Sequence, residues 1–184
     1  MIKVLIIAII FSFHNPALSS SKNKIISNIK LTNNFNFNFI QTIGEKKDNG
    51  ICVIKYPKKI FCKYEKSNKK IIVSNGKSLV IKYQSSGSYY IYPLKRTPLE
   101  FLLDKDYLIS KINNLDPISI NNKYFNFIIL ENNNKINIYF DKKKFYLAGW
   151  QTEDIYQNIT STFISSIKIN GEIDDKVFIL PNRD

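Results

Sequence analysis

Histidine is almost absent from this chain of 184 residues. Its one histidine, His14, lies in an N-terminal segment that we expect to be removed, so the mature chain would have none. Without imidazole a protein cannot use Ser-His-Asp or Cys-His catalysis, and it lacks the commonest ligand of transition metals. The acidic pairs Glu153-Asp154 and Asp174-Asp175 fall in expected turns, where carboxylates are usually solvated. We therefore predict that the protein is not an enzyme and holds no metal and no cofactor.

Arginine is also scarce, with only Arg96 and Arg183, although the formal net charge is +12. Arginine is the residue that most often reads nucleic-acid bases, and the lysines are scattered along expected strands and turns instead of gathering on one helix. Gly76-Lys77-Ser78 resembles the end of a phosphate-binding loop, but the earlier glycine of that motif would fall at Ile71. The sequence therefore argues against nucleic acid and nucleotides as partners, and it leaves open a weak attraction to anionic membrane surfaces.

The first residues have the pattern of an export signal. A basic start, Met1-Ile2-Lys3, precedes an apolar run from Val4 to Phe13, and Ala17-Leu18-Ser19 supplies the small residues that a signal peptidase reads. The alternative is a membrane anchor, but a helix of this run would span only about 15 Å of a hydrocarbon core of ~30 Å. We predict a cleaved signal peptide over residues 1–19 and a single domain over residues 20–184. No cysteine stands at the cleavage site, so we expect no lipid anchor there.

A β-hairpin is predicted around Pro57. Residues alternate in polarity with a period of two over Gly50–Tyr56 and again over Ile60–Tyr64, with Pro57-Lys58-Lys59 between them. Cys52 and Cys62 fall on the same face of this hairpin, so they are candidate cross-strand neighbours. In an exported protein the two could form a disulfide, and the alternative is a pair of free thiols that fill the inner face.

A second hairpin and two helices are predicted from local signals. Asn75-Gly76 between apolar runs is typical of a type I′ turn, which needs positive φ at both central residues. Lys22 to about Asn34 carries the apolar stripe of a helix. Thr97-Pro98-Leu99-Glu100 predicts a helix from Pro98 to about Asp104, with Thr97 as its cap and Glu100 completing a capping box. Tyr107–Ile112 is interpreted as a further turn.

The rest of the chain favours antiparallel strands. The other predicted strands are Phe35–Ile40, Tyr124–Glu131, Lys135–Phe140, Phe145–Thr152, Thr160–Ile169 and a closing strand Asp174–Leu180, with turns at Lys46–Gly50, Asn132–Asn134 and Asp141–Lys144. The fold class is thus mainly β (α+β), a long antiparallel sheet whose concave face receives the apolar stripes of the helices.

The concave face is predicted to be strongly apolar. Strand alternation turns the following residues inward: Ile54, Tyr56, Ile60, Ile72, Leu79, Ile81, Phe125, Phe127, Ile136, Ile138, Phe140 and Leu147. Either the helices pack these residues into an ordinary core, or the face encloses a cavity for an apolar guest. The sequence leaves both interpretations open.

Several of these segments, in this order, resemble the LolA family of periplasmic lipoprotein carriers, in particular its shorter alphaproteobacterial forms. The resemblance rests on Gly50 with Lys55–Ile60 and Tyr64, on Ile72–Leu79, on Thr97-Pro98-Leu99 with Leu102-Leu103, on Phe140-Asp141 with Leu147–Trp150, on Thr162-Phe163 with Ile169-Asn170, and on Val177–Ile179 with Pro181. Each piece alone is weak, and their order and spacing carry the similarity.

The resemblance implies an incomplete antiparallel β-barrel of about eleven strands with a helical lid on its concave face. It implies a periplasmic carrier, in a Gram-negative cell, that shields the acyl chains of lipoproteins between the inner and outer membranes. Its partners would be acylated lipoproteins, an inner-membrane ABC-type lipoprotein-releasing complex, and an outer-membrane receptor or the outer membrane itself. We expect a monomer. The alternatives are a carrier or sensor for another amphiphile, such as a free lipid or glycolipid, and an enzyme with a polar cluster inside the sheet.

The expected acyl-chain cavity combines the inward-facing strand residues with the helix that begins at Pro98. Its candidate residues are Ile54, Tyr56, Ile60, Cys62, Ile72, Leu79, Ile81, Leu99, Leu102, Phe125, Phe127, Ile138 and Leu147. Two departures from the family pattern matter. Tyr56 stands where the family often has Arg before the proline, so a lid held by that Arg cannot be carried over. The chain also ends three residues after Pro181, without the C-terminal extension of the longer forms.

Overall fold

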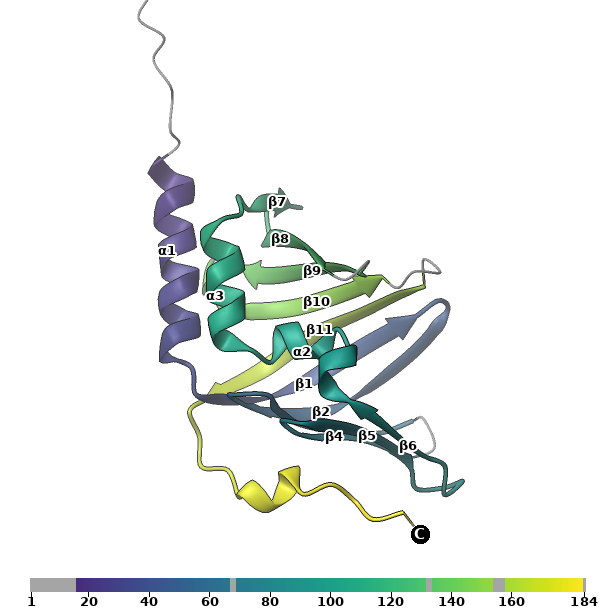
Figure 1. Cartoon of the computed structure of the whole chain (residues 1–184). Helices are drawn as coiled ribbons and strands as arrows, with labels where there is room; N and C mark the ends of the chain where they lie inside the picture. Colours follow the sequence, from purple (N-terminus) through teal and green to yellow (C-terminus); the bar gives the residue numbers. More distant parts are fainter. Residues whose placement is uncertain (1–15, 67–68, 132–133, 154–157, 184) are drawn as a thin grey trace, which may run out of the picture.

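One antiparallel sheet of eleven strands is the frame of the protein in the computed structural model, which describes residues 16–66, 69–131, 134–153 and 158–183 (Figure 1). The strands are β1 (Asn34–Ile43), β2 (Lys46–Lys55), β3 (Lys59–Tyr64), β4 (Lys70–Asn75), β5 (Ser78–Tyr83), β6 (Tyr89–Pro93), β7 (Ile118–Ile120), β8 (Tyr124–Glu131), β9 (Asn134–Asp141), β10 (Leu147–Glu153) and β11 (Ile159–Ile169). The helices are α1 (Pro16–Leu31), α2 (Leu99–Leu102) and α3 (Lys105–Asn113), with 3₁₀ turns η1 (Leu94–Arg96) and η2 (Asp175–Phe178).

The strand order is β6-β5-β4-β3-β2-β1-β11-β10-β9-β8-β7. The sheet curls without closing, so β6 and β7 are its two edges, and α1, α2 and α3 lie on its concave side (Figure 1). These three helices together form the lid of the sheet. The prediction of an incomplete β-barrel with a helical lid is therefore confirmed.

The connection between β1 and β2 is tighter than predicted. Ile43 pairs with Lys46, so the turn consists of Gly44 and Glu45, and Gly44 takes a positive φ of 56°. The predicted turn at Lys46–Gly50 is wrong. These polar residues form the solvent-exposed end of β2. A strand can carry polar residues there and keep its hydrogen bonds to β1.

The β4–β5 hairpin forms, but without the predicted turn geometry. Of Asn75 and Gly76 only Gly76 has a positive φ, of 96°, so the type I′ prediction is wrong. The Asn75 Oδ1 accepts hydrogen bonds from the backbone N–H groups of Lys77 and Ser78, both at 3.0 Å. This side-chain turn places Asn75 before the bend and leaves glycine alone with the left-handed conformation.

Helix α1 confirms the predicted N-terminal helix, and it buries Ile25, Ile26 and Ile29 against the sheet. It begins at Pro16, inside the segment assigned to the signal peptide. Residues 1–15 lie outside the described part of the chain, so the signal peptide stays a prediction. Within the described residues, none of the helices combines the length and the apolar character needed to cross a membrane.

Helix α2 confirms the helix predicted after Thr97, but the capping box is wrong. The Thr97 hydroxyl donates to the carbonyl of Leu94 at 2.8 Å, and the Glu100 carboxylate pairs with Lys58 in the β2–β3 turn instead of the helix backbone. The turn predicted at Tyr107–Ile112 is part of α3. Its N-cap is Asp104, whose carboxylate accepts the N–H of Tyr107 at 3.0 Å, a capping signal that the sequence analysis missed.

Strands β8 to β11 follow the predictions closely, with small differences at their ends. Phe145, expected in a strand, has a positive φ of 59° and donates its N–H to the carbonyl of Asp141, so it ends the predicted turn and β10 starts at Leu147. The short edge strand β7 was not predicted. In the turn expected at Asn132–Asn134, residues 132–133 lie outside the described part.

The closing strand predicted at Asp174–Leu180 is wrong, because this segment forms η2 against β3 and β4, on the side of the sheet away from the lid (Figure 1). Asp174 caps it by accepting the N–H of Lys176 at 2.9 Å. Asp175 pairs with Lys55 at 2.7 Å and Lys59 at 3.7 Å, so these carboxylates are engaged and not merely solvated. Aspartate favours such caps over strands.

Phe178 fixes the C-terminal segment on the sheet. Its side chain is 2% exposed, and the Lys59 ammonium lies 5.7 Å from its ring centroid. Val73 and Val80 are also buried, and the strand alternation turns them to this convex face, opposite the main core. The sheet is therefore covered on both faces along β3 to β5.

The change Phe178→Ala should destabilise the protein by about 1–3 kcal/mol, at or below the usual loss for a buried aromatic, because the terminal segment can detach without unfolding the sheet. Urea unfolding followed by circular dichroism would measure this. The matched control is Ile179→Ala, since Ile179 is 68% exposed, and we expect a change of about 0.5 kcal/mol or less. Equal effects of the two changes would contradict the packing of Phe178 described here.

Candidate functional site

The concave face of the sheet and the inner face of the lid form one apolar layer. Of the predicted cavity residues, Ile54, Ile60, Cys62, Leu79, Leu102, Phe125, Phe127 and Ile138 are buried in it, while Tyr56, Ile72, Leu99 and Leu147 are partly buried against it. Ile81 lies beside this layer, near the β6 edge. The lid contributes Ile25, Ile29, Leu102, Leu103, Leu108 and Ile112 to the same layer. Thus much of the hollow is occupied by the protein's own side chains.

A cavity of about 160 Å³ remains beneath the start of α2. Its apolar wall is made by Phe39, Ile60, Ile72, Leu99 and Trp150, together with the bonded sulfurs of Cys52 and Cys62. These two cysteines lie directly opposite each other on β2 and β3, as the hairpin pattern predicted. In the structure they form a disulfide that crosses the cavity wall.

An open groove of about 370 Å³ adjoins this cavity on β5 and β6. It is lined by Ile81, Tyr83, Ser86, Ser88, Tyr90 and Tyr92. Ile81 of the groove pairs directly with Ile72 of the cavity, so the two hollows lie over adjacent strands of the concave face, although no residue lines both. Tyr90 and Tyr92 are 48% and 43% exposed, which makes this edge the most open aromatic part of that face.

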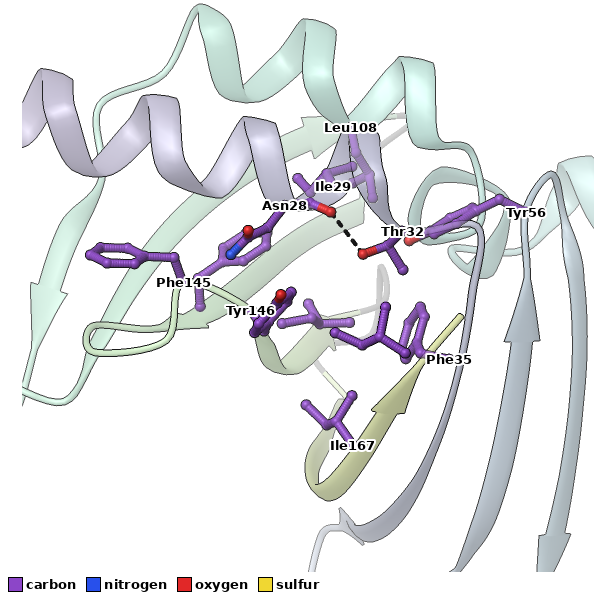
Figure 2. Close-up of a pocket in the computed structure, with 12 residues that line it drawn as sticks. Asn28, Ile29, Thr32, Phe35, Tyr56, Leu108, Phe145, Tyr146 and Ile167 are labelled. Atoms are coloured by element: carbon purple, nitrogen blue, oxygen red, sulfur yellow. Dashed lines mark hydrogen bonds between the residues drawn. The ribbon is translucent and has the colours of Figure 1, made fainter. Parts of the chain in front are cut away.

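A third hollow, of about 40 Å³, lies beneath α1 (Figure 2). Figure 2 shows Ile29 of α1 and Thr32, the residue after this helix, facing Phe35 of β1 and Ile167 of β11, with Tyr56 at one side. The Thr32 hydroxyl is turned back to the Asn28 carbonyl at 2.7 Å, which leaves the walls mostly apolar. This space is large enough only for a small group, so α1 is closely packed on the sheet.

The two hollows beneath the lid helices, of about 160 and 40 Å³, are small compared with the about 300–1,000 Å³ of typical small-molecule pockets. The cavity beneath α2 is covered by a helix of only four residues. The chemistry offered there is apolar enclosure with a polar rim.

A lysine at the tip of the β2–β3 hairpin holds α2 in place. The Lys58 ammonium lies 2.6 Å from Glu100 Oε1 and 3.2 Å from Asp104 Oδ2, and these hydrogen bonds, to Glu100 first and to Asp104 second, raise its pKa. The Lys58 N–H also donates to the carbonyl of Leu103 at 2.9 Å. The ends of α2 are thereby attached to the sheet through a single turn, which follows the cis Tyr56-Pro57 bond.

Other polar contacts attach α1 and α3. Lys105 donates to the carbonyl of Thr32 at 3.0 Å, and Lys22 donates to the carbonyl of Leu115 at 3.1 Å, so each joins α1 to the α3 region. The Glu131 carboxylate on β8 accepts hydrogen bonds from Lys111 and Tyr107 of α3, both at 2.8 Å, and these bonds lower its pKa. α1 and α3 therefore have several anchors in addition to the contact of Lys58 with Asp104, the N-cap of α3.

The outer rim of the α2 cavity is polar, and this feature was missed in the sequence analysis. Tyr64 donates to Gln41 Oε1 at 3.0 Å, and Gln41 Nε2 donates to the Thr162 hydroxyl at 3.0 Å. Burial raises the pKa of Tyr64, and burial lowers the pKa of Lys70, whose ammonium lies 3.6 Å from the Tyr64 ring centroid. The sequence does contain a signal for this rim. The alternation of Phe35, Phe37 and Phe39 along β1 continues to Gln41 and turns this polar residue inward.

The chain is similar to known proteins in family and in fold. The family model of the outer membrane lipoprotein carrier protein LolA matches residues 30–180. None of the curated proteins gives a significant match. An uncharacterised conserved protein from Thermus thermophilus has a similar structure, with 7% identity, a TM-score of 0.53, and coverage of 90% of this chain and 94% of that one.

Two more solved structures resemble the chain less closely. A LolA superfamily protein from Nitrosomonas europaea gives 10% identity and a TM-score of 0.48, covering 89% of this chain and 97% of that one. LprF from Mycobacterium bovis gives 10% identity and a TM-score of 0.49, covering 87% and 97%.

Replacing Lys58 with Met should loosen α2 without unfolding the sheet, because it removes both ion pairs and keeps a side chain of similar length. A partly exposed ion pair contributes about 1 kcal/mol or less, so amide hydrogen exchange over residues 98–104 should become about three- to fivefold faster. Lys77→Met removes the same charge at the exposed tip of the neighbouring hairpin, and we expect it to leave amide exchange over residues 98–104 unchanged. Equal protection of residues 98–104 in all three proteins would exclude Lys58 as an anchor.

Stability should fall as the pH rises above about 10. An unfolded tyrosine loses its proton near this pH, whereas burial raises the pKa of Tyr64 and of Tyr56 and keeps both phenols neutral in the folded protein. Unfolding then releases protons, so each step toward higher pH favours the unfolded state. Urea unfolding midpoints between pH 8 and pH 11.5 would measure the decline, and Tyr64→Phe should make it shallower. An unchanged slope in that variant would show that the Tyr64 phenol ionises equally easily in both states.

Proposed function

Because the chain belongs to the LolA family of outer membrane lipoprotein carriers, we propose that it binds lipoprotein acyl chains in the hollow between its sheet and its lid. In this proposal residues 1–19 are a signal peptide, and residues 20–184 are a single, monomeric carrier domain in the periplasm. The protein is not an enzyme and needs no metal or cofactor. It receives its cargo at the inner membrane and delivers it to the outer membrane.

The observation that carries the proposal is the apolar cavity beneath α2, which adjoins an open groove on the same concave face. Its inner wall consists of aliphatic and aromatic side chains and a disulfide, and its lining residues carry no charge. Such a wall cannot bind a charged or strongly polar ligand along its length, because burial of polar groups without partners is unfavourable. A hydrocarbon chain needs no partners, so it fits this environment.

In this proposal, burial of an acyl chain supplies the free energy that opens the site. Burial gains about 0.8 kcal/mol per CH₂, so a sixteen-carbon chain gains on the order of 12 kcal/mol before the costs of binding. Those costs include displacement of α2 and of the partly buried Leu99, whose contacts with the core would be replaced by ligand contacts. A helix of four residues has few contacts to lose, which makes it the natural moving part.

Transfer between membranes follows from differences in affinity in this proposal. The sequence has no nucleotide-binding motif, so an inner-membrane ABC-type complex would supply the work of loading. At the outer membrane, a receptor or the bilayer itself would bind the acyl chains more tightly and draw them out. The thirteen cavity residues predicted from the sequence are proposed to contact the chain as α2 moves, with Ile72, Ile81 and Leu99 nearest the opening.

An acylated lipopeptide whose stearoyl chain carries two bromine atoms should quench the fluorescence of Trp150. Trp150 is the only tryptophan of the chain and lines the cavity beneath α2, and bromine quenches tryptophan on close contact. Ile72→Phe should weaken binding about tenfold, because overpacking a filled site costs about 1–3 kcal/mol. The control is Ile91→Phe on the exposed face of β6, where the side chain is 55% exposed, and we expect unchanged binding.

The outcomes of this titration separate the candidate functions. Quenching by the brominated lipopeptide, and none by the same peptide without its acyl chain, would support the carrier function. Displacement of the lipopeptide by an equal concentration of free lipid would favour a carrier or sensor for another amphiphile. If no acylated compound quenches Trp150 or competes, the proposed function is wrong.

A further inference from the structure

The polar rim of the α2 cavity has an arrangement that packing alone does not require. Thr162 of β11 is 2% exposed, yet its side chain lines the cavity and its hydroxyl is bonded only as an acceptor, from Gln41. Among the described residues no group accepts the Thr162 hydroxyl hydrogen. A buried donor without an acceptor is unfavourable, so a hydroxyl kept in this state is a candidate ligand contact.

The neighbours of Thr162 restrict where that hydrogen can point. Tyr64 donates to Gln41 Oε1, and this orients the amide so that its nitrogen donates to Thr162 Oγ1, each step at 3.0 Å. A hydroxyl that accepts one hydrogen bond becomes a better donor, since hydrogen bonds in a chain polarise one another. The chain Tyr64–Gln41–Thr162 therefore ends in a donor at the cavity surface.

The rim carries dipoles and no charge. The polar residues that line the cavity are Gln41, Tyr64, Thr152, Thr160 and Thr162, while the other lining residues are apolar. Lys70 lies outside this lining and is engaged with the Tyr64 ring. A carboxylate or phosphate would lose its hydration here without gaining a counter-ion, which is strongly unfavourable. A neutral acceptor needs only the one donor that Thr162 offers.

We propose that this rim is a subsite for the neutral carbonyl group, ester or amide, that joins an acyl chain to the polar part of the ligand. The proposal rests on the proposed function, because it places the hydrocarbon against Ile60, Ile72 and Trp150. Thr162 donates to the carbonyl oxygen, and Gln41 and Tyr64 position Thr162. The site would then distinguish acyl linkages from hydrocarbons that lack a carbonyl, and it would fix how deep the chain enters.

Three brominated probes with the same chain length test the subsite through Trp150 fluorescence. They are a glycerol stearoyl ester, a stearoyl amide of glycinamide, and a glycerol ether that lacks the carbonyl. In the unmodified protein the ester and the amide should each bind about three- to tenfold more tightly than the ether, as expected for one hydrogen bond in a desolvated site. The ester and amide arms distinguish the two sources of the carbonyl.

In Thr162→Val this preference should disappear while the ether binds as before, because the substitution removes the hydroxyl and keeps the shape of the side chain. Thr42→Val is the matched control, since Thr42 follows Gln41 on β1 and faces the opposite side of the sheet, and the preference should remain. Equal affinity for ester, amide and ether in the unmodified protein, or a preference that survives in Thr162→Val, would overturn the subsite and leave the carrier function intact. Failure of every probe to bind would instead overturn the proposed function.

Discussion

The structure depends on the need to cover one apolar face. An eleven-stranded sheet that curls without closing leaves two edges, β6 and β7. It also leaves a concave surface of Phe, Ile and Leu side chains, whose exposure to water would be unfavourable. The three helices of the lid cover this surface with their apolar faces. Because the hydrophobic effect is not directional, it holds the lid on the sheet without fixing its position. Position is supplied by a few polar contacts at the ends of the helices.

These contacts are unevenly distributed over the three helices of the lid. Lys105 joins α1 to the α3 region, and Glu131 ties α3 to β8, whereas α2 is attached mainly through the tip of the β2–β3 hairpin. The Cys52–Cys62 disulfide stiffens that hairpin at its centre. Tyr56 stands where the family pattern often has an arginine before the proline. In this chain, Lys58, two residues later, supplies the cation that meets α2.

The sequence predicted the fold better than the site, for physical reasons. Strand alternation repeats over many residues and fixes which side faces inward, so Ile54, Ile60, Phe127 and Ile138 were placed correctly in the buried layer. Polar segments are harder, because their partners are distant in the chain. Lys46–Gly50 has the composition of a turn, but its pairing with β1 makes it part of a strand. Asp174–Leu180 has the alternation of a strand, but Asp174 caps a 3₁₀ turn and Asp175 pairs with lysines of β2 and β3.

The rim of the cavity shows the same limit more sharply. Gln41 and Thr162 are 121 residues apart, and no local pattern links them to Tyr64. Their inward orientation was predictable by counting along β1 and β11, but their hydrogen bonds depend on the register between strands that are neighbours only in the folded sheet. Likewise, the volume that remains beneath α2 depends on how the side chains of the lid fill the hollow. Alternation identifies the residues of a wall, but not the space between the walls.

A partly filled hollow agrees with the proposed binding and release of acyl chains. A carrier that held a permanent cavity of full size would bind hydrocarbon so tightly that release would be slow, since a sixteen-carbon chain gains on the order of 12 kcal/mol on burial. When the protein's own side chains occupy the hollow, the ligand competes with them, and its apparent affinity falls by the fraction of molecules in the open state. Each kcal/mol that closes α2 through Lys58 or Leu99 therefore weakens retention by about fivefold. In the proposed function, the strength of the lid contacts would set the balance between shielding the acyl chain in water and releasing it to a membrane.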